Sequence, residues 1–210
     1  MAIPVALVRT GNTIMSTIIS NNTRRDAMRV CVLSFGAMAA LSADPAMAAA
    51  ARRAGRAGQA RAGDIDILNV ALGLEHEAID AYQIGAESGL LTKPVLDLAV
   101  DFQSHHKSHR DAIVSTITQL GGRPVAAKSR ADYLIGLEVA KITTAVDVLR
   151  LAARLEKGAA NAYIGVIPSF SDRNLTQVAA KIAADETMHW TALARALGDE
   201  LPKAALTFGA

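Results

Sequence analysis

The sequence has 210 residues, which is long enough for one folded domain preceded by a leader. It is 51% hydrophobic but only 4% aromatic, a balance that favours helices and argues against a β-sandwich. The formal net charge of +2 gives no electrostatic support for a nucleic-acid partner.

Residues 1–48 are predicted to be a twin-arginine export signal. Arg24 and Arg25 follow a polar segment, an apolar run covers residues 30–41, and a small-x-small cleavage site ends at Ala48. The apolar run is too short and too rich in alanine and glycine to span a membrane, so we expect no span in the mature protein. Export would make the twin-arginine machinery a partner and place the mature protein in the periplasm or elsewhere outside the cytoplasm. The alternative is an uncleaved N-terminal anchor.

Cleavage would remove four of the 22 basic residues, two of the 20 acidic residues and the only cysteine, Cys31. The mature chain would then be close to neutral and free of cysteine, which suits an oxidising compartment. Residues 49–63, AAARRAGRAGQARAG, are basic and interrupted by glycine, and we predict a flexible linker there. The alternative is a patch for an anionic lipid or envelope polymer.

Apolar stripes at helical spacing predict four long helices in residues 64–200, followed by a tail at 201–210. We expect them at about 64–88, from a cap at Thr92 to 120, at 143–166, and from a cap at Ser171 to 197. Residues 131–140 suggest a short extra helix on a crossover of about 20 residues. The predicted fold is therefore all-α, a four-helix bundle of two helical hairpins joined by a long crossover.

The two predicted hairpins resemble each other in sequence. LEHEAIDAY, which contains Glu75 and Tyr82, returns 81 residues later as LEKGAANAY, which contains Glu156 and Tyr163. We interpret this match as an internal repeat. Each tyrosine is predicted to pack beside the cluster with its hydroxyl hydrogen-bonded to a neighbouring ligand. A redox role for the tyrosines is the alternative.

The second helix of each hairpin carries two candidate metal ligands at positions i and i+3. His106 and His109 lie in HHKSH, and Glu186 and His189 lie in ETMH, 80 residues later. A carboxylate on an apolar stripe is costly unless something pairs with it, and a bound cation would remove that cost. The candidate metal ligands are Glu75, His106, His109, Glu156, Glu186 and His189. His105 and Asp185 are expected beside the ligands or at the surface.

This pattern resembles the ferritin-like superfamily of carboxylate-bridged di-metal proteins. In that superfamily two helices each give one glutamate and the other two each give Glu-x-x-His. The resemblance is more specific to exported bacterial ferritin-like domain proteins, which include desiccation- and stress-related members. It implies non-haem iron or manganese, with zinc less favoured, and chemistry on peroxide, dioxygen or ferrous iron.

His106 departs from the superfamily pattern because it stands where a bridging glutamate is expected. Two arrangements therefore remain open: an asymmetric pair of metals with His106 and His109 as terminal ligands, or a single metal. The sequence assigns no catalytic residue and does not indicate an oligomeric state. It leaves three roles open, namely oxidation chemistry, metal sequestration, and a structural, stress-related bundle that binds nothing.

Overall fold

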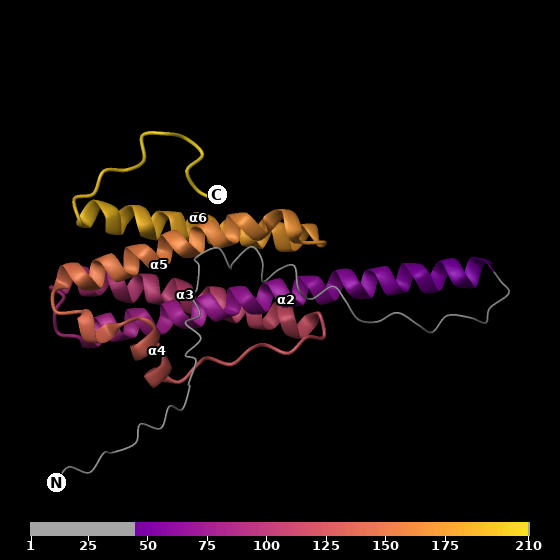
Figure 1. The fold of residues 1–210 in the computed structure, drawn as a ribbon, viewed down its shortest axis with the longest axis horizontal. Coiled ribbons are helices and arrows are strands. Elements are labelled where there is room, and N and C mark those ends of the chain that lie inside the picture. Colours follow the sequence, from indigo (N-terminus) through magenta and orange to yellow (C-terminus); the bar gives the residue numbers. More distant parts are fainter. Residues whose placement is uncertain (1–44, 210) are drawn as a thin grey trace, which may run out of the picture. The chain divides into compact units, whose positions relative to one another are not determined.

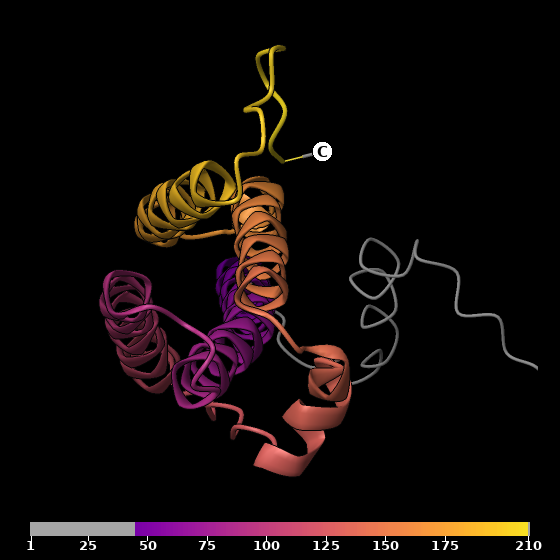
Figure 2. The same cartoon turned by 90° about the vertical axis from the view of Figure 1, so that its left-hand side faces the viewer.

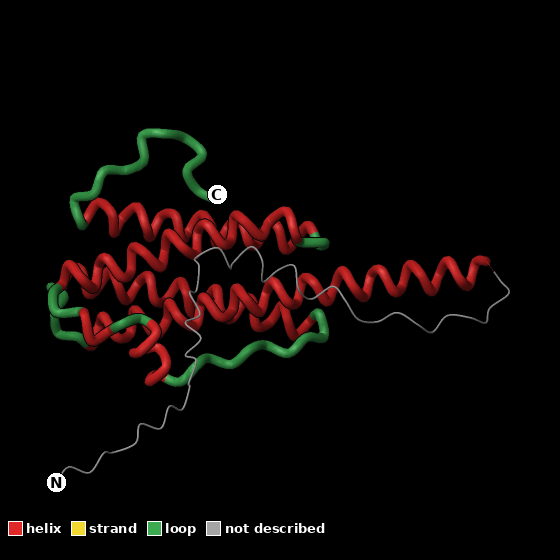
Figure 3. The backbone as a smooth tube through the Cα atoms, in the orientation of Figure 1, coloured by secondary structure: helices red, strands yellow, loops and turns green. Residues whose placement is uncertain are grey.

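The computed structural model describes residues 45–209, and every regular element within that range is helical (Figure 3). The five α-helices are α2 (Pro45–Glu87), α3 (Lys93–Gln119), α4 (Arg130–Gly136), α5 (Ala145–Val166) and α6 (Arg173–Ala196). Two short 3-10 helices, η1 (Val139–Lys141) and η2 (Ile167–Ser169), complete the list. The predicted export signal lies outside this range except for its last four residues. None of the helices in the described range is both long and apolar enough to cross a bilayer.

The four long helices pack in two pairs. Helix α3 returns along α2, α6 returns along α5, and α2 also contacts α5 (Figures 1 and 2). The short helix α4 lies on the connection between the pairs and packs through Tyr133 and Leu137 against Ile84 and Leu151. The short extra helix predicted on the crossover is thus present.

The ends of the helices follow from local sequence. Ser129 caps α4 and Thr144 caps α5, each in a reciprocal capping box with the acidic residue three positions later. Gly121 and Gly198 follow α3 and α6 with positive φ, a conformation that costs glycine little. Thr92 precedes α3 as predicted, although its side chain makes no capping hydrogen bond.

The predicted cap of the fourth helix at Ser171 is wrong by one residue. Asp172 caps α6, because its carboxylate accepts a hydrogen bond from the backbone N–H of Asn174 at 2.8 Å. The backbone N–H of Ser171 instead donates to the Asp64 carboxylate at 2.8 Å. This contact ties the start of α6 to α2.

The predicted flexible linker at residues 49–63 is helical in the structure. It forms the exposed N-terminal part of α2, which extends past the ends of the other helices (Figure 1). Alanine has the highest helix propensity, and extending an existing helix requires no new nucleation, so the three glycines in this segment do not end it. Packing against other helices begins at Asp64, where the folded body was predicted to start.

Two apolar clusters enclose a layer of polar side chains. One cluster includes Leu72, Ile113 and Ala183, and the other includes Tyr82, Phe102 and Leu193. On every long helix the candidate ligands lie between these clusters along the chain; on α2, for example, Glu75 lies between Leu72 and Tyr82. The clusters therefore hold the polar layer in the interior, away from water.

Candidate metal centre

The structure brings all six predicted ligands together. Their side chains come from four helices: Glu75 from α2, His106 and His109 from α3, Glu156 from α5, and Glu186 and His189 from α6. None of the six is more than 8% exposed. Three carboxylates and three imidazoles are thus confined to one buried layer.

These residues form two overlapping groups of four, within each of which the potential ligand atoms all lie within 4.8 Å of one another. The first group is Glu75, His106, His109 and Glu186, and the second is His106, Glu156, Glu186 and His189. Only His106 and Glu186 belong to both groups, and they occupy matched positions in the two hairpins. Each group offers enough oxygen and nitrogen atoms to hold a metal ion.

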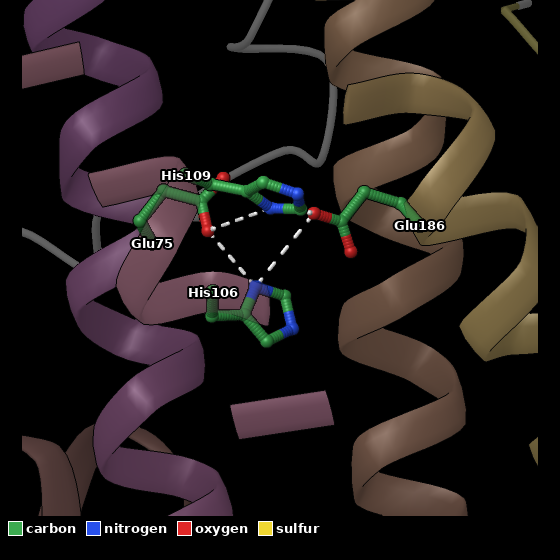
Figure 4. Close-up of side chains that lie close together, drawn as sticks. All are labelled: Glu75, His106, His109 and Glu186. Atoms are coloured by element: carbon green, nitrogen blue, oxygen red, sulfur yellow. Dashed lines mark hydrogen bonds and ion pairs between the residues drawn. The ribbon is translucent and has the colours of Figure 1, made fainter. Parts of the chain in front are cut away.

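In the first group the side chains point toward a common centre (Figure 4). His106 Nδ1 lies 2.9 Å from Glu75 Oε2 and 3.6 Å from Glu186 Oε1. His109 Nδ1 lies 3.1 Å from Glu186 Oε1 and 3.7 Å from Glu75 Oε2. Two nitrogens and two oxygens therefore converge from α2, α3 and α6.

The second group uses the other atoms of the two shared residues. His106 Nε2 lies 3.1 Å from Glu156 Oε1. His189 Nδ1 lies 3.3 Å from Glu186 Oε2 and 3.4 Å from Glu156 Oε2. Glu186 thus presents one oxygen to each group, and His106 presents one ring nitrogen to each group.

Two buried atoms of the cluster show that the residues fit a metal ion. His109 Nδ1 and Glu186 Oε1 are both buried, and neither has a hydrogen-bond partner among the described residues, although they lie 3.1 Å apart. A buried polar atom without a partner is costly, and a cation shared by the nitrogen and the oxygen would remove that cost. The mixture of imidazole and carboxylate donors suits iron, manganese or zinc.

The outer nitrogens of two histidines are also held in place. His109 Nε2 lies 3.1 Å from Asp185 Oδ2, and His189 Nε2 lies 2.9 Å from His105 Nδ1. A histidine that binds a metal through one ring nitrogen characteristically uses the other in a hydrogen bond that fixes its orientation. His105 and Asp185 therefore lie beside the ligands, the first of the two positions expected for them from sequence.

The two tyrosines bond to the carboxylates of the opposite hairpin. Tyr82 of α2 donates to Glu156 of α5, and Tyr163 of α5 donates to Glu75 of α2. The prediction that each tyrosine packs and hydrogen-bonds to a neighbouring ligand is confirmed. Burial and the adjacent carboxylate charge raise the pKa of both phenols well above its usual range, so both remain donors.

Mutual pairing shifts the protonation of the cluster. Burial opposes a charge on His106 and His109, but hydrogen bonds and the charges of the glutamates prevail and raise the pKa of His106 to about 11 and that of His109 to about 10. The pKa of His189 is raised for the same reasons. Without a metal, the histidines are therefore cations that offset the charge of the carboxylates.

The three glutamates do not respond alike. Burial favours the neutral form of each, but hydrogen bonds from histidines outweigh burial at Glu75 and Glu156, so their pKa is lowered. At Glu186 burial prevails and the pKa is raised. Glu186, the carboxylate shared by both groups, is thus the one whose charge the protein alone compensates least.

Comparison with known proteins agrees with this geometry. Residues 63–199 match the ferritin-like domain family. The chain belongs to this family. The match covers the four long helices from the point where α2 begins to pack, together with every residue of the buried cluster.

This ferritin-like chain is also similar to a solved structure, that of a conserved hypothetical protein from Mycobacterium tuberculosis. The two share 26% sequence identity with a TM-score of 0.58, over 65% of this chain and 98% of that one. No curated protein matches the chain.

Proposed function

We propose that the four long helices form a ferritin-like four-helix bundle built from two repeated hairpins, α2–α3 and α5–α6. The pairing of the helices and the connection through α4 support this topology. The exchange of hydrogen bonds between Tyr82 and Glu156, and between Tyr163 and Glu75, supports the repeat, because matched residues make matched contacts.

The bundle binds a non-haem metal, iron or manganese, in a mononuclear or dinuclear centre, with zinc less favoured. The observation that carries this proposal is the pair of buried four-residue groups that share His106 and Glu186. Glu75 and His109 would serve the first group, and Glu156 and His189 the second. The alternative is a cluster in which protonated histidines neutralise the glutamates and no metal binds, as in a structural, stress-related bundle.

Iron or manganese, when bound, would supply one-electron chemistry toward peroxide, dioxygen or ferrous iron in stress defence. This chain's own residues provide the buried ligands, and the two apolar clusters exclude water. The tyrosines fix the orientation of Glu75 and Glu156, and Asp185 and His105 fix that of His109 and His189. Sequestration of the metal without turnover uses the same residues and is the second candidate role.

Metal content tests this proposal. The exported protein, purified without a chelating tag, should contain about one or two equivalents of iron or manganese. The double variant Glu186→Ala, His189→Ala should lose them, because it removes ligands from both groups. The matched control His76→Ala, Glu77→Ala changes the same two residue types outside the cluster and should keep its metal. Metal-free wild-type protein, with equal stability in the first variant, would support the structural alternative instead.

We further propose that residues 1–48 direct export through the twin-arginine route, which places the bundle outside the cytoplasm. The support is the sequence alone, namely Arg24 and Arg25 before an apolar run and a small-x-small site ending at Ala48. The double variant Arg24→Lys, Arg25→Lys should accumulate in the cytoplasm in cell fractionation. Unchanged export of this variant would contradict the assignment.

A further inference from the structure

A second feature of the domain is an apolar cavity of about 490 Å³ between α2, α3 and α5. Its walls come from aliphatic side chains that include Ile84, Leu91, Leu98, Leu149 and Leu151. None of the described residues that line it is charged, and its only hydroxyl groups belong to Tyr82, Ser88 and Thr143. The volume lies within the range of small-molecule sites, which is roughly 300–1,000 Å³.

The hydroxyl groups of the lining are already hydrogen-bonded within the protein. Ser88 donates to the carbonyl of Gly85 at 2.6 Å, Thr143 lies 3.3 Å from the carboxylate of Asp147, and Tyr82 donates to Glu156. A polar or charged ligand would therefore lose its hydration without gaining partners. Water would also be poorly held, since a buried water needs two to four polar partners. The cavity favours an apolar occupant.

The cavity has one end at the surface and the other beside the polar cluster. Ser88 and Thr143 are exposed, which places the opening near the turn between α2 and α3. At the inner end Phe102 stacks on the His189 imidazole with ring centroids 4.1 Å apart, and Tyr82 reaches Glu156. One layer of aromatic side chains thus separates the cavity from the candidate ligands.

We propose that this cavity is a binding site for a single aliphatic chain, such as that of a fatty acid or a fatty alcohol. The chain enters near Ser88 and Thr143, lies along the leucine and isoleucine side chains, and ends against Phe102 and Tyr82. Its head group stays in solvent, because no charged side chain lines the cavity to receive it. This binding does not require a metal and is independent of the proposed metal centre.

The test is a fluorescence titration of the full metal-free chain, after removal of lipid, with cis-parinaric acid, a fluorescent long-chain fatty acid. We expect saturable binding at one site and displacement of the probe by dodecanoate and by dodecanol to a similar extent. Absence of saturable binding would overturn the proposal. Displacement by dodecanoate but not by dodecanol would also overturn it, because recognition would then depend on a charge.

Variants with a larger side chain in the cavity make the test site-specific. Ala152→Leu on α5 and Ala99→Leu on α3 each add bulk to the lining and should weaken probe binding about tenfold or more. Ala159→Leu, at a half-buried position of α5 outside the lining, is the matched control and should bind as wild type does. Circular dichroism establishes that each variant folds. Equal affinity of all three folded variants would place the probe elsewhere and contradict the proposal.

Discussion

Replacement of Glu186 by glutamine should abolish metal binding in both groups of the cluster, whereas replacement of Glu75 should affect only one. Glu186 presents Oε1 to the histidines of the first group and Oε2 to His189 of the second. Glu75 belongs to the first group alone. Glutamine keeps the size of the side chain but removes its charge and replaces one acceptor oxygen with a donor.

The expected loss is large because Glu186 contributes an oxygen directly to each group. Mutation of residues that only support metal ligands costs about 10- to 100-fold in affinity, so loss of a shared ligand should cost about 100-fold or more. Folding should survive the change, since burial already favours the neutral form of this side chain. The variant thus separates metal binding from stability.

The measurement is an anaerobic titration of the metal-free protein with ferrous iron, and a parallel titration with manganese. Glu75→Gln should retain binding through His106, Glu156, Glu186 and His189, and Glu77→Gln, outside the cluster, should behave as wild type does. Wild-type affinity in Glu186→Gln would contradict the assignment of this residue. Equal loss in Glu75→Gln and Glu186→Gln would mean that the cluster holds one metal and not two.

The positions of the long helices could be predicted from sequence because their signals are local. The capping sequences at Thr144 and Ser129, the glycines after α3 and α6, and the apolar stripes all act within a few residues. The N-terminal part of α2 was missed because basic residues and glycines are typical of linkers. In the structure, continuity with the packed part of α2 outweighs that composition.

The six residues of the cluster could be predicted because a repeated sequence placed the same residue types on four apolar stripes. The partners of each side chain could not, because they depend on how helices distant in sequence pack. Tyr82 bonds to Glu156, 74 residues away, and His109 bonds to Asp185, 76 residues away. The aliphatic cavity has no sequence signal, since its lining residues read as ordinary core positions.

The metal-free protein should lose stability as the pH rises from 6.5 to about 9. The pKa of His106 rises from its ordinary value of 6.5 to about 11 in the folded protein, and that of His109 to about 10. A raised pKa contributes stability that is complete below pH 6.5 and is lost as the pH rises through the folded value. A pKa difference of one corresponds to about 1.4 kcal/mol, so His106 alone should account for on the order of 3 kcal/mol over this range.

The acidic limb should run in the opposite direction. The pKa of Glu75 and of Glu156 is lowered below 4.5, so their contribution is present above pH 4.5 and is lost as the pH falls further. Glu186, whose pKa is raised, acts in the same direction as the histidines and adds to the alkaline decline. The metal-free protein should therefore be most stable at about pH 5 to 6.5.

Urea denaturation of the metal-free protein at a series of pH values measures this profile. His109→Asn and His106→Asn should each flatten the alkaline decline, whereas His76→Asn, the same change outside the cluster, should leave it intact. Bound metal should remove the decline, because ligation takes the place of the protons on the histidines, and the apparent metal affinity should rise with pH. A stability that is constant from pH 6.5 to 9 in the metal-free wild type would show that the histidines are not protonated against the glutamates, and would remove the neutral, metal-free cluster as an alternative to metal binding.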